Sequence, residues 1–85
     1  MYTLLIKSRA ESDLRRLSPT IYSLIFSKLE RLCEICDDYP HKALKGEYRG
    51  KFSLSVAKDY RILYTFDRRF REIVVHRVGH RSKVY

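Results

Sequence analysis

Long apolar runs, glycine and proline are all scarce in this sequence. No run approaches the roughly 18–20 apolar residues that a membrane-spanning helix needs. The first apolar segment, residues 2–7, is too short and wrongly flanked for a signal peptide, so we expect a cytoplasmic protein without membrane association. With three glycines, two prolines, 45% hydrophobic and 33% charged residues, the composition is globular, and residues 1–85 are predicted to form one domain.

Cysteine is equally scarce, since Cys33 and Cys36 form a single C-x-x-C pair. His41 is near in sequence, but a fourth ligand at zinc-site spacing is missing. A redox motif would stand at a helix start after a strand, whereas this pair falls at a predicted helix end. We therefore predict two small core residues. The chain also has no paired-carboxylate or histidine-rich cluster, so neither a metal nor a cofactor is expected.

Acidic residues are few in one half of the chain only. Residues 1–40 carry six Lys/Arg and six Asp/Glu, whereas residues 41–85 carry twelve and four. The whole formal excess of +8 therefore belongs to the C-terminal half. Such a one-sided excess is expected of a protein whose partner is rich in phosphate or carboxylate. A solvated basic surface without a partner is the alternative.

The first half predicts one strand followed by two helices. Residues 2–7 alternate as a strand, and Leu5 need not be exposed if that strand is central. Ser8 and Glu11 have capping-box spacing at the start of a helix, and Ser18-Pro19 is a start signal for a second one. The short junction predicts an antiparallel helical hairpin. Its apolar positions recur at helical spacing: Ala10, Leu14, Leu17, Ile21, Leu24, Ile25, Leu29, Leu32 and Cys36.

The second half predicts an antiparallel meander. After a cationic linker over residues 40–50, strands are expected at residues 51–56, 60–66 and 72–78, joined by a turn at 57–59 and a polar loop at 67–71. Gly79-His80-Arg81 is expected to turn the chain after the last strand. The fold class is thus α+β, in the order β-α-α-β-β-β, with an N-terminal helical hairpin packed on a mainly antiparallel four-stranded sheet.

This order resembles that of the RelE/ParE superfamily of toxins from type II toxin–antitoxin systems. The strings that carry the resemblance are Leu44-Lys45-Gly46, residues 60–64 (YRILY) and residues 77–85 (RVGHRSKVY). The ending favours the RelE branch over the ParE branch. The resemblance implies a RelE-like fold and a ribosome-dependent mRNA endonuclease that cleaves mRNA in the ribosomal A site without a metal. It also implies neutralisation by a cognate, RelB-like antitoxin.

The resemblance also implies positions for the active site. The arginine that begins the middle strand matches Arg61, the arginine past the Val-Gly-x segment matches Arg81, and the closing tyrosine matches Tyr85. His80 fills the position before that arginine. RelE enzymes carry two lysines on the outward face of the preceding strand, and with a one-residue shift these positions are Ser53 and Ser55 here.

The chemistry of RNA cleavage assigns roles to these residues. Arg61 and Arg81 are expected to hold one phosphate with their planar guanidinium groups, and His80 to transfer a proton near neutral pH. Tyr85 is a candidate acid or stacking residue, and Lys51 or Lys58 a candidate base. Further contacts to RNA or the ribosome are predicted at Lys45, Arg49, Ser53, Ser55, Lys58, Arg77 and Lys83.

Each assignment has an alternative. Arg61 could flank a strand and pair with Asp59 or Glu72, while His80 and Arg81 could belong to a plain basic tail, and His76 is expected to be structural. For the whole protein, the missing lysine pair keeps open a ParE-like poison of DNA gyrase without nuclease activity. A catalytically inactive RNA-binding module that only represses its operon is the third hypothesis.

Overall fold

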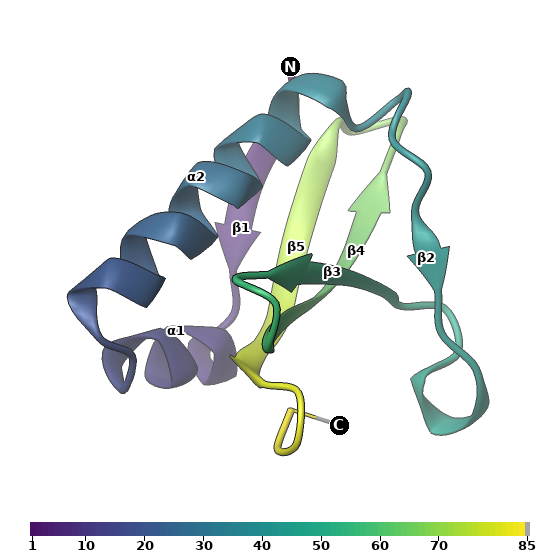
Figure 1. The fold of residues 1–85 in the computed structure, drawn as a ribbon. Helices are drawn as coiled ribbons and strands as arrows, with labels where there is room; N and C mark the ends of the chain where they lie inside the picture. Colours follow the sequence, from purple (N-terminus) through teal and green to yellow (C-terminus); the bar gives the residue numbers. More distant parts are fainter. Residues whose placement is uncertain (85) are drawn as a thin grey trace.

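The computed structural model describes residues 1–84, and Tyr85 lies outside the described residues. Figure 1 shows α2 crossing one face of the sheet, with α1 at the end of the sheet where the C-terminal turn also lies. Among the described residues, no helix is long and apolar enough to cross a membrane. In chain order the elements are β1 (Thr3–Ile6), α1 (Ser8–Arg15), α2 (Pro19–Ile35), β2 (Lys42–Ala43), the 3-10 helix η1 (Gly46–Tyr48), β3 (Phe52–Val56), β4 (Tyr60–Asp67) and β5 (Glu72–His80).

The sheet has five strands in the order β1-β5-β4-β3-β2, one more than the four predicted. The additional strand is β2, a two-residue piece of the predicted linker that pairs antiparallel with β3. The meander β3-β4-β5 is antiparallel as predicted, and β1 joins it in parallel through Thr3–Ile6 and Glu72–Val75. Because β1 is an edge strand and not a central one, Leu5 is half exposed.

The two helices begin differently. Ser18 caps α2 as predicted, because its Oγ accepts a hydrogen bond from the Ile21 amide at 3.3 Å and Pro19 follows at the first helical position. The capping box predicted at Ser8 is wrong: Lys7 occupies the N-cap, and no side chain caps the helix. The Lys7 amide still donates to the Val75 carbonyl at 3.0 Å, so strand pairing continues up to the first turn of α1 and leaves no room for a separate capping residue.

The hydrophobic core lies between the helices and one sheet face. It comprises the buried faces of α1 and α2 and the inward residues of β3, β4 and β5. Cys33 and Cys36 are buried free cysteines within it, which confirms the prediction made for them. Leu24 was predicted on the same stripe but is 45% exposed, so the stripe is not buried at every position.

His41 fixes the segment that follows α2. The carbonyl of Cys36 can only accept, so the 2.8 Å contact places a proton on His41 Nε2, and Nδ1 of the neutral ring then accepts from the Tyr64 hydroxyl at 2.5 Å. The His41 ring also stacks on Phe66, with centroids 4.1 Å apart. These contacts hold residues 36–42 against the sheet and bring β2 to the edge of β3.

Candidate functional site

The β3–β4 turn is the base of the candidate site. Ala57 and Lys58 have φ angles of 49° and 68°, in the left-handed region that residues with a Cβ rarely adopt. The turn lies beside the end of β5, since the Arg81 amide donates to the Asp59 carbonyl at 2.7 Å. A strained and closely held turn therefore joins the start of β4 to the residues that follow β5.

Arg61 and Arg81 both attach to this turn. One Arg61 nitrogen, Nη1, donates to the carbonyls of Lys58 and Tyr60 at 3.1 and 3.2 Å, so carbonyl groups orient this guanidinium, and no carboxylate of residues 1–84 forms an ion pair with it. Arg81 Nε lies 3.7 Å from Asp59 Oδ1, which is too long for a hydrogen bond, and its side chain is 59% exposed. Both guanidinium groups thus keep N–H donors for an anionic ligand. Neither Asp59 nor Glu72, the partners considered for Arg61 in the alternative reading, forms an ion pair with it.

His80 lies on a different side of the sheet from Arg61. Tyr60 pairs with His80 and Arg61 with Gly79 along the β4–β5 ladder, and successive side chains of a strand point to opposite faces. The His80 ring packs edge-on against Tyr60 with centroids 5.7 Å apart. Because the Ser82 amide donates to Nδ1 at 3.2 Å, the neutral ring carries its proton on Nε2 and offers a donor there.

Of Lys51 and the two serines, only Ser55 lies directly beside Arg61. Ser55 pairs with Arg61 across β3–β4 and is exposed, as predicted. Ser53 was predicted at the surface, and this is wrong: it is only 5% exposed, because β2 pairs alongside it and makes β3 an interior strand there. Lys51 precedes Phe52, which pairs with Tyr64, so Lys51 lies about 13 Å along the ladder from Arg61 at roughly 3.3 Å per residue.

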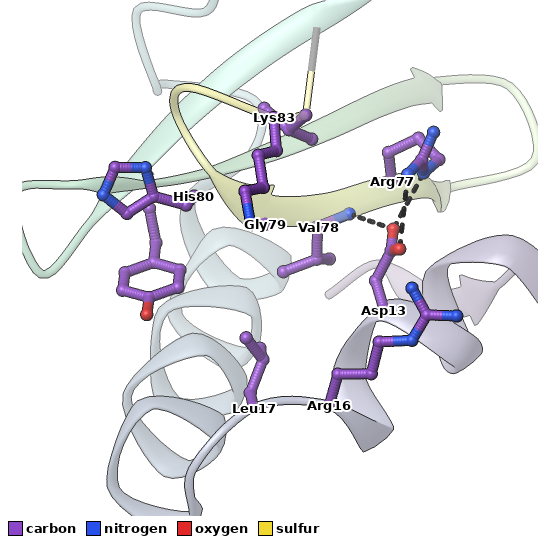
Figure 2. Close-up of a pocket in the computed structure, with 10 residues that line it drawn as sticks. Asp13, Arg16, Leu17, Arg77, Val78, Gly79, His80 and Lys83 are labelled. Carbon is purple, nitrogen blue, oxygen red and sulfur yellow. Dashed lines mark hydrogen bonds and ion pairs between the residues drawn. The ribbon is translucent and has the colours of Figure 1, made fainter.

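Arg77, predicted to contact RNA, is instead held by Asp13 at the end of α1. Its Nε and Nη2 donate to the Asp13 carboxylate at 2.8 and 3.3 Å, and the Val78 amide donates to the same carboxylate at 2.9 Å (Figure 2). Burial alone raises the pKa of Asp13, but the hydrogen bonds from Arg77 and Val78 lower it below its usual value. Asp13 therefore neutralises Arg77. It also accepts the hydrogen bond of the Val78 amide, which lies beyond the part of β5 that pairs with β1.

Beside this ion pair is a surface pocket of about 300 Å³, which we call the terminal pocket. The end of α1 forms one wall, and the end of β5 with the C-terminal turn forms the other (Figure 2). Its lining residues are Asp13, Arg16, Leu17, Tyr60, Arg77, Val78, Gly79, His80, Lys83 and Val84. The turn itself covers residues 81–83, because β5 continues through His80, two residues beyond its predicted end and past the predicted Gly79-His80-Arg81 turn.

Other predicted contact residues lie at the surface. Lys45, Arg49, Lys58 and Lys83 are exposed. His76 is structural, as predicted: its Nε2 lies 2.9 Å from Thr65 Oγ1, and burial together with the charges of Lys7 and Lys51 lowers its pKa. Within residues 1–84, no three His, Cys, Asp or Glu side chains gather as a metal site.

A family model described as the ParE toxin of type II toxin–antitoxin systems, parDE, matches residues 4–85. The chain belongs to this toxin family. The toxin is also similar to a chain of the toxin–antitoxin complex RelBE2 from Mycobacterium tuberculosis, at 30% identity and a TM-score of 0.82 over 96% of this chain and 93% of that chain. A search of curated protein sequences gives no match.

Two more distant structures share the toxin's fold. The isolated RelE toxin of E. coli is 21% identical, with a TM-score of 0.77 over 94% of this chain and 84% of that one. The YoeB/ParE toxin from Agrobacterium tumefaciens is 14% identical, with a TM-score of 0.76 over 92% and 96%. The chain is thus a RelE-like α+β toxin of the type II class, which confirms the predicted superfamily and fold class.

Seven lining residues of the terminal pocket were not predicted as site residues: Asp13, Arg16, Leu17, Tyr60, Val78, Gly79 and Val84. Asp13 did leave a signal. It follows Ala10 by three residues and precedes Leu17 by four, so it lies on the apolar face of the predicted helix. An acid on such a face is expected to have a buried partner. No comparable pattern marks Arg16, which reads as an ordinary exposed cation.

Proposed function

We propose that this toxin is a ribosome-dependent mRNA endonuclease that acts in the cytoplasm, inhibits translation, and is neutralised by a RelB-like antitoxin. The observation that carries the proposal is the pair of guanidinium groups, Arg61 and Arg81, held at the same turn with donors unused. Arg61 begins β4 and Arg81 follows β5 at the same turn, and we propose that one phosphodiester contacts both. The basic half of the chain then supplies further contacts to ribosomal RNA.

The proposed reaction needs little from the protein, because RNA contains its own nucleophile. The 2′-hydroxyl attacks the adjacent phosphorus, the bond to the 5′-oxygen breaks, and the departing oxygen takes up a proton. Negative charge grows on the phosphoryl oxygens in the transition state, and donors fixed beforehand stabilise it without reorganising. Arg61 is suited to this role because the carbonyls of Lys58 and Tyr60 already orient it.

His80 is assigned a binding role beside the proton transfer predicted for it. Because Nδ1 accepts from the Ser82 amide, the neutral ring presents Nε2–H, which can donate to a phosphate oxygen. Lys51 is too far along the ladder to act as a base beside Arg61. Substrate binding is therefore assigned to Arg61, Arg81 and His80, and Tyr85 keeps its predicted role as acid or stacking residue.

The test is primer extension on a reporter mRNA in a translating extract, with naked RNA in parallel. Arg61→Ala and Arg81→Ala should each slow cleavage by about 100-fold or more, the usual cost of one lost transition-state donor. Arg69→Ala is the matched control, because Arg69 is an exposed cation of the β4–β5 loop and should leave cleavage unchanged. Equal cleavage of naked RNA would reject the ribosome requirement, and two fully active arginine variants would reject the site.

The family model favours a second candidate, since its description is that of the ParE toxin. In this reading the toxin poisons DNA gyrase, and the buried Ser53 in place of an outward lysine agrees with the lack of nuclease activity. Induction would then trap gyrase on DNA and start a DNA-damage response while reporter mRNA stays intact. Primer extension and a plasmid supercoiling assay on the same induced culture separate the two functions.

A further inference from the structure

The terminal pocket carries more positive than negative charge, because Arg16, Arg77 and Lys83 line it and Asp13 is the carboxylate among its described lining residues. Arg16 and Lys83 line it from opposite walls, and among the described residues neither side chain makes a hydrogen bond or an ion pair (Figure 2). The one carboxylate in the lining, Asp13, is already bonded to Arg77. His80 adds its Nε2–H donor at the same wall as Lys83. The pocket is therefore suited to an anion.

The pocket also has apolar and aromatic lining residues, which an inorganic anion would not contact favourably. The half-buried Leu17 supplies apolar surface, and the half-buried Tyr60 supplies an aromatic ring that meets His80 edge-on. Val78 and Val84 also line the pocket but are only 2% and 4% exposed. An inorganic anion gains nothing from such a surface, whereas a ligand with both a phosphate and a flat apolar part gains from each. The pocket lies at the end of β5, directly before Arg81, and its residues Tyr60 and His80 lie on the sheet face opposite to Arg61.

We propose that the terminal pocket binds one nucleotide of an RNA strand, with the phosphate held by Arg16, Lys83 and His80 and the base against Leu17 and Tyr60. This inference rests on the proposed function, because it gives the RNA a second anchoring point beyond Arg61 and Arg81. It also adds Arg16, a residue of the helical half, to an interface otherwise formed by the basic half.

Binding can be measured by NMR on the antitoxin-free toxin with three probes: uridine 5′-monophosphate, inorganic phosphate, and an acidic peptide with alternating Glu and Leu. The nucleotide should shift the methyl signals of Leu17 and the ring signals of Tyr60 and should bind at least about tenfold more tightly than inorganic phosphate, since base contacts add to the anion contact. Three results would overturn the proposal: no shifts at these two residues, equal affinity for phosphate, or tighter binding of the peptide, which would mark an antitoxin site.

A matched pair of variants tests the same pocket with RNA. Arg16→Ala should weaken binding of a short single-stranded RNA about tenfold and lower the slope of log affinity against log salt by about 0.7, the loss of one phosphate contact. Arg15→Ala removes the neighbouring exposed cation, which does not line the pocket, and should change neither quantity. Equal effects of the two variants would show general charge loss and overturn the site.

The outcomes separate this inference from the proposed function. Nucleotide shifts at Leu17 and Tyr60 without mRNA cleavage in the extract would support the pocket and reject the nuclease. Cleavage that needs Arg61 and Arg81, together with unchanged signals of Leu17 and Tyr60 and an unaffected Arg16→Ala variant, would support the nuclease and reject the pocket.

Discussion

Asp13→Asn is the substitution that best tests the packing of α1 on β5. The wild-type carboxylate accepts three hydrogen bonds, two from Arg77 and one from the Val78 amide. The side chain of Arg77 is 30% exposed and that of Asp13 is 12% exposed. The asparagine keeps the shape and one acceptor oxygen, but its amide group faces the Arg77 guanidinium as a second donor. The variant therefore loses the ion pair and leaves a partly buried cation without a partner.

The expected cost follows from this geometry. Losing a hydrogen bond to a charged group costs about 1.5–3 kcal/mol, and partial exposure of Arg77 lets water replace some of it, so we expect about 2 kcal/mol. For a domain of this size that corresponds to a decrease in Tm of about 8–16 °C. Urea unfolding at pH 7 measures the difference, with an unchanged m-value as the sign that only stability has changed.

The pH dependence makes this prediction specific. The pKa of Asp13 is lowered in the folded state, so its stabilisation is present above the unfolded pKa of about 3.9 and is lost as the pH falls through the folded value. The gap between wild type and Asp13→Asn should therefore close between pH 5 and pH 2. Asp59→Asn is the matched control, because its partner Arg81 lies 3.7 Å away and both side chains are exposed. A cost under about 0.5 kcal/mol at pH 7, or a gap that does not depend on pH, would refute the reasoning.

Three further predictions concern other parts of the fold. Ala57→Gly should stabilise the toxin by about 0.5–1 kcal/mol in urea unfolding, because φ at this position is positive; a loss of stability would contradict the strained turn. His41→Phe should cost about 2 kcal/mol by the same method, because it leaves the buried hydroxyl of Tyr64 without its acceptor, and a neutral effect would contradict that bond. The hydrogen bond to Asp37, with burial, raises the pKa of Tyr2 to about 12, so its contribution is present below pH 10 and is lost as the pH rises towards 12. The urea midpoint should consequently fall more steeply over that range in wild type than in Tyr2→Phe, and parallel curves would contradict the shift.

Local patterns predicted most of the elements because each pattern has a local cause. The strands β3, β4 and β5 follow from alternation, and the start of α2 follows from Ser18 and Pro19. The edge position of β1 does not follow from its own residues, because its neighbour in the sheet lies about seventy residues away in sequence. The same limit applies to β2, whose two residues become a strand only because His41 holds the preceding segment in place.

The sequence indicated which residue types belong to the candidate site better than it indicated how they are arranged. Arg61 and Arg81 both contact the β3–β4 turn, since strand order alone brings their backbones together, and their roles stay a prediction. The register decided the rest. The strand register places His80 on the same sheet face as Tyr60, and it buries Ser53 between β2 and β4. A bulge at Leu63/Tyr64 lies opposite the part of β5 in which Arg77 bonds to Asp13. None of these pairings can be read from spacing within a single strand.

The parallel pairing of the first strand with the last has a consequence for biosynthesis. Thr3–Ile6 finds its partner only when residues 72–75 have left the ribosome, so the nascent chain cannot complete its sheet before these residues emerge. Contacts this distant in sequence also slow folding. A chain cut short anywhere before residue 72 would lack the partner of its edge strand, so incomplete synthesis yields a chain whose sheet is unfinished.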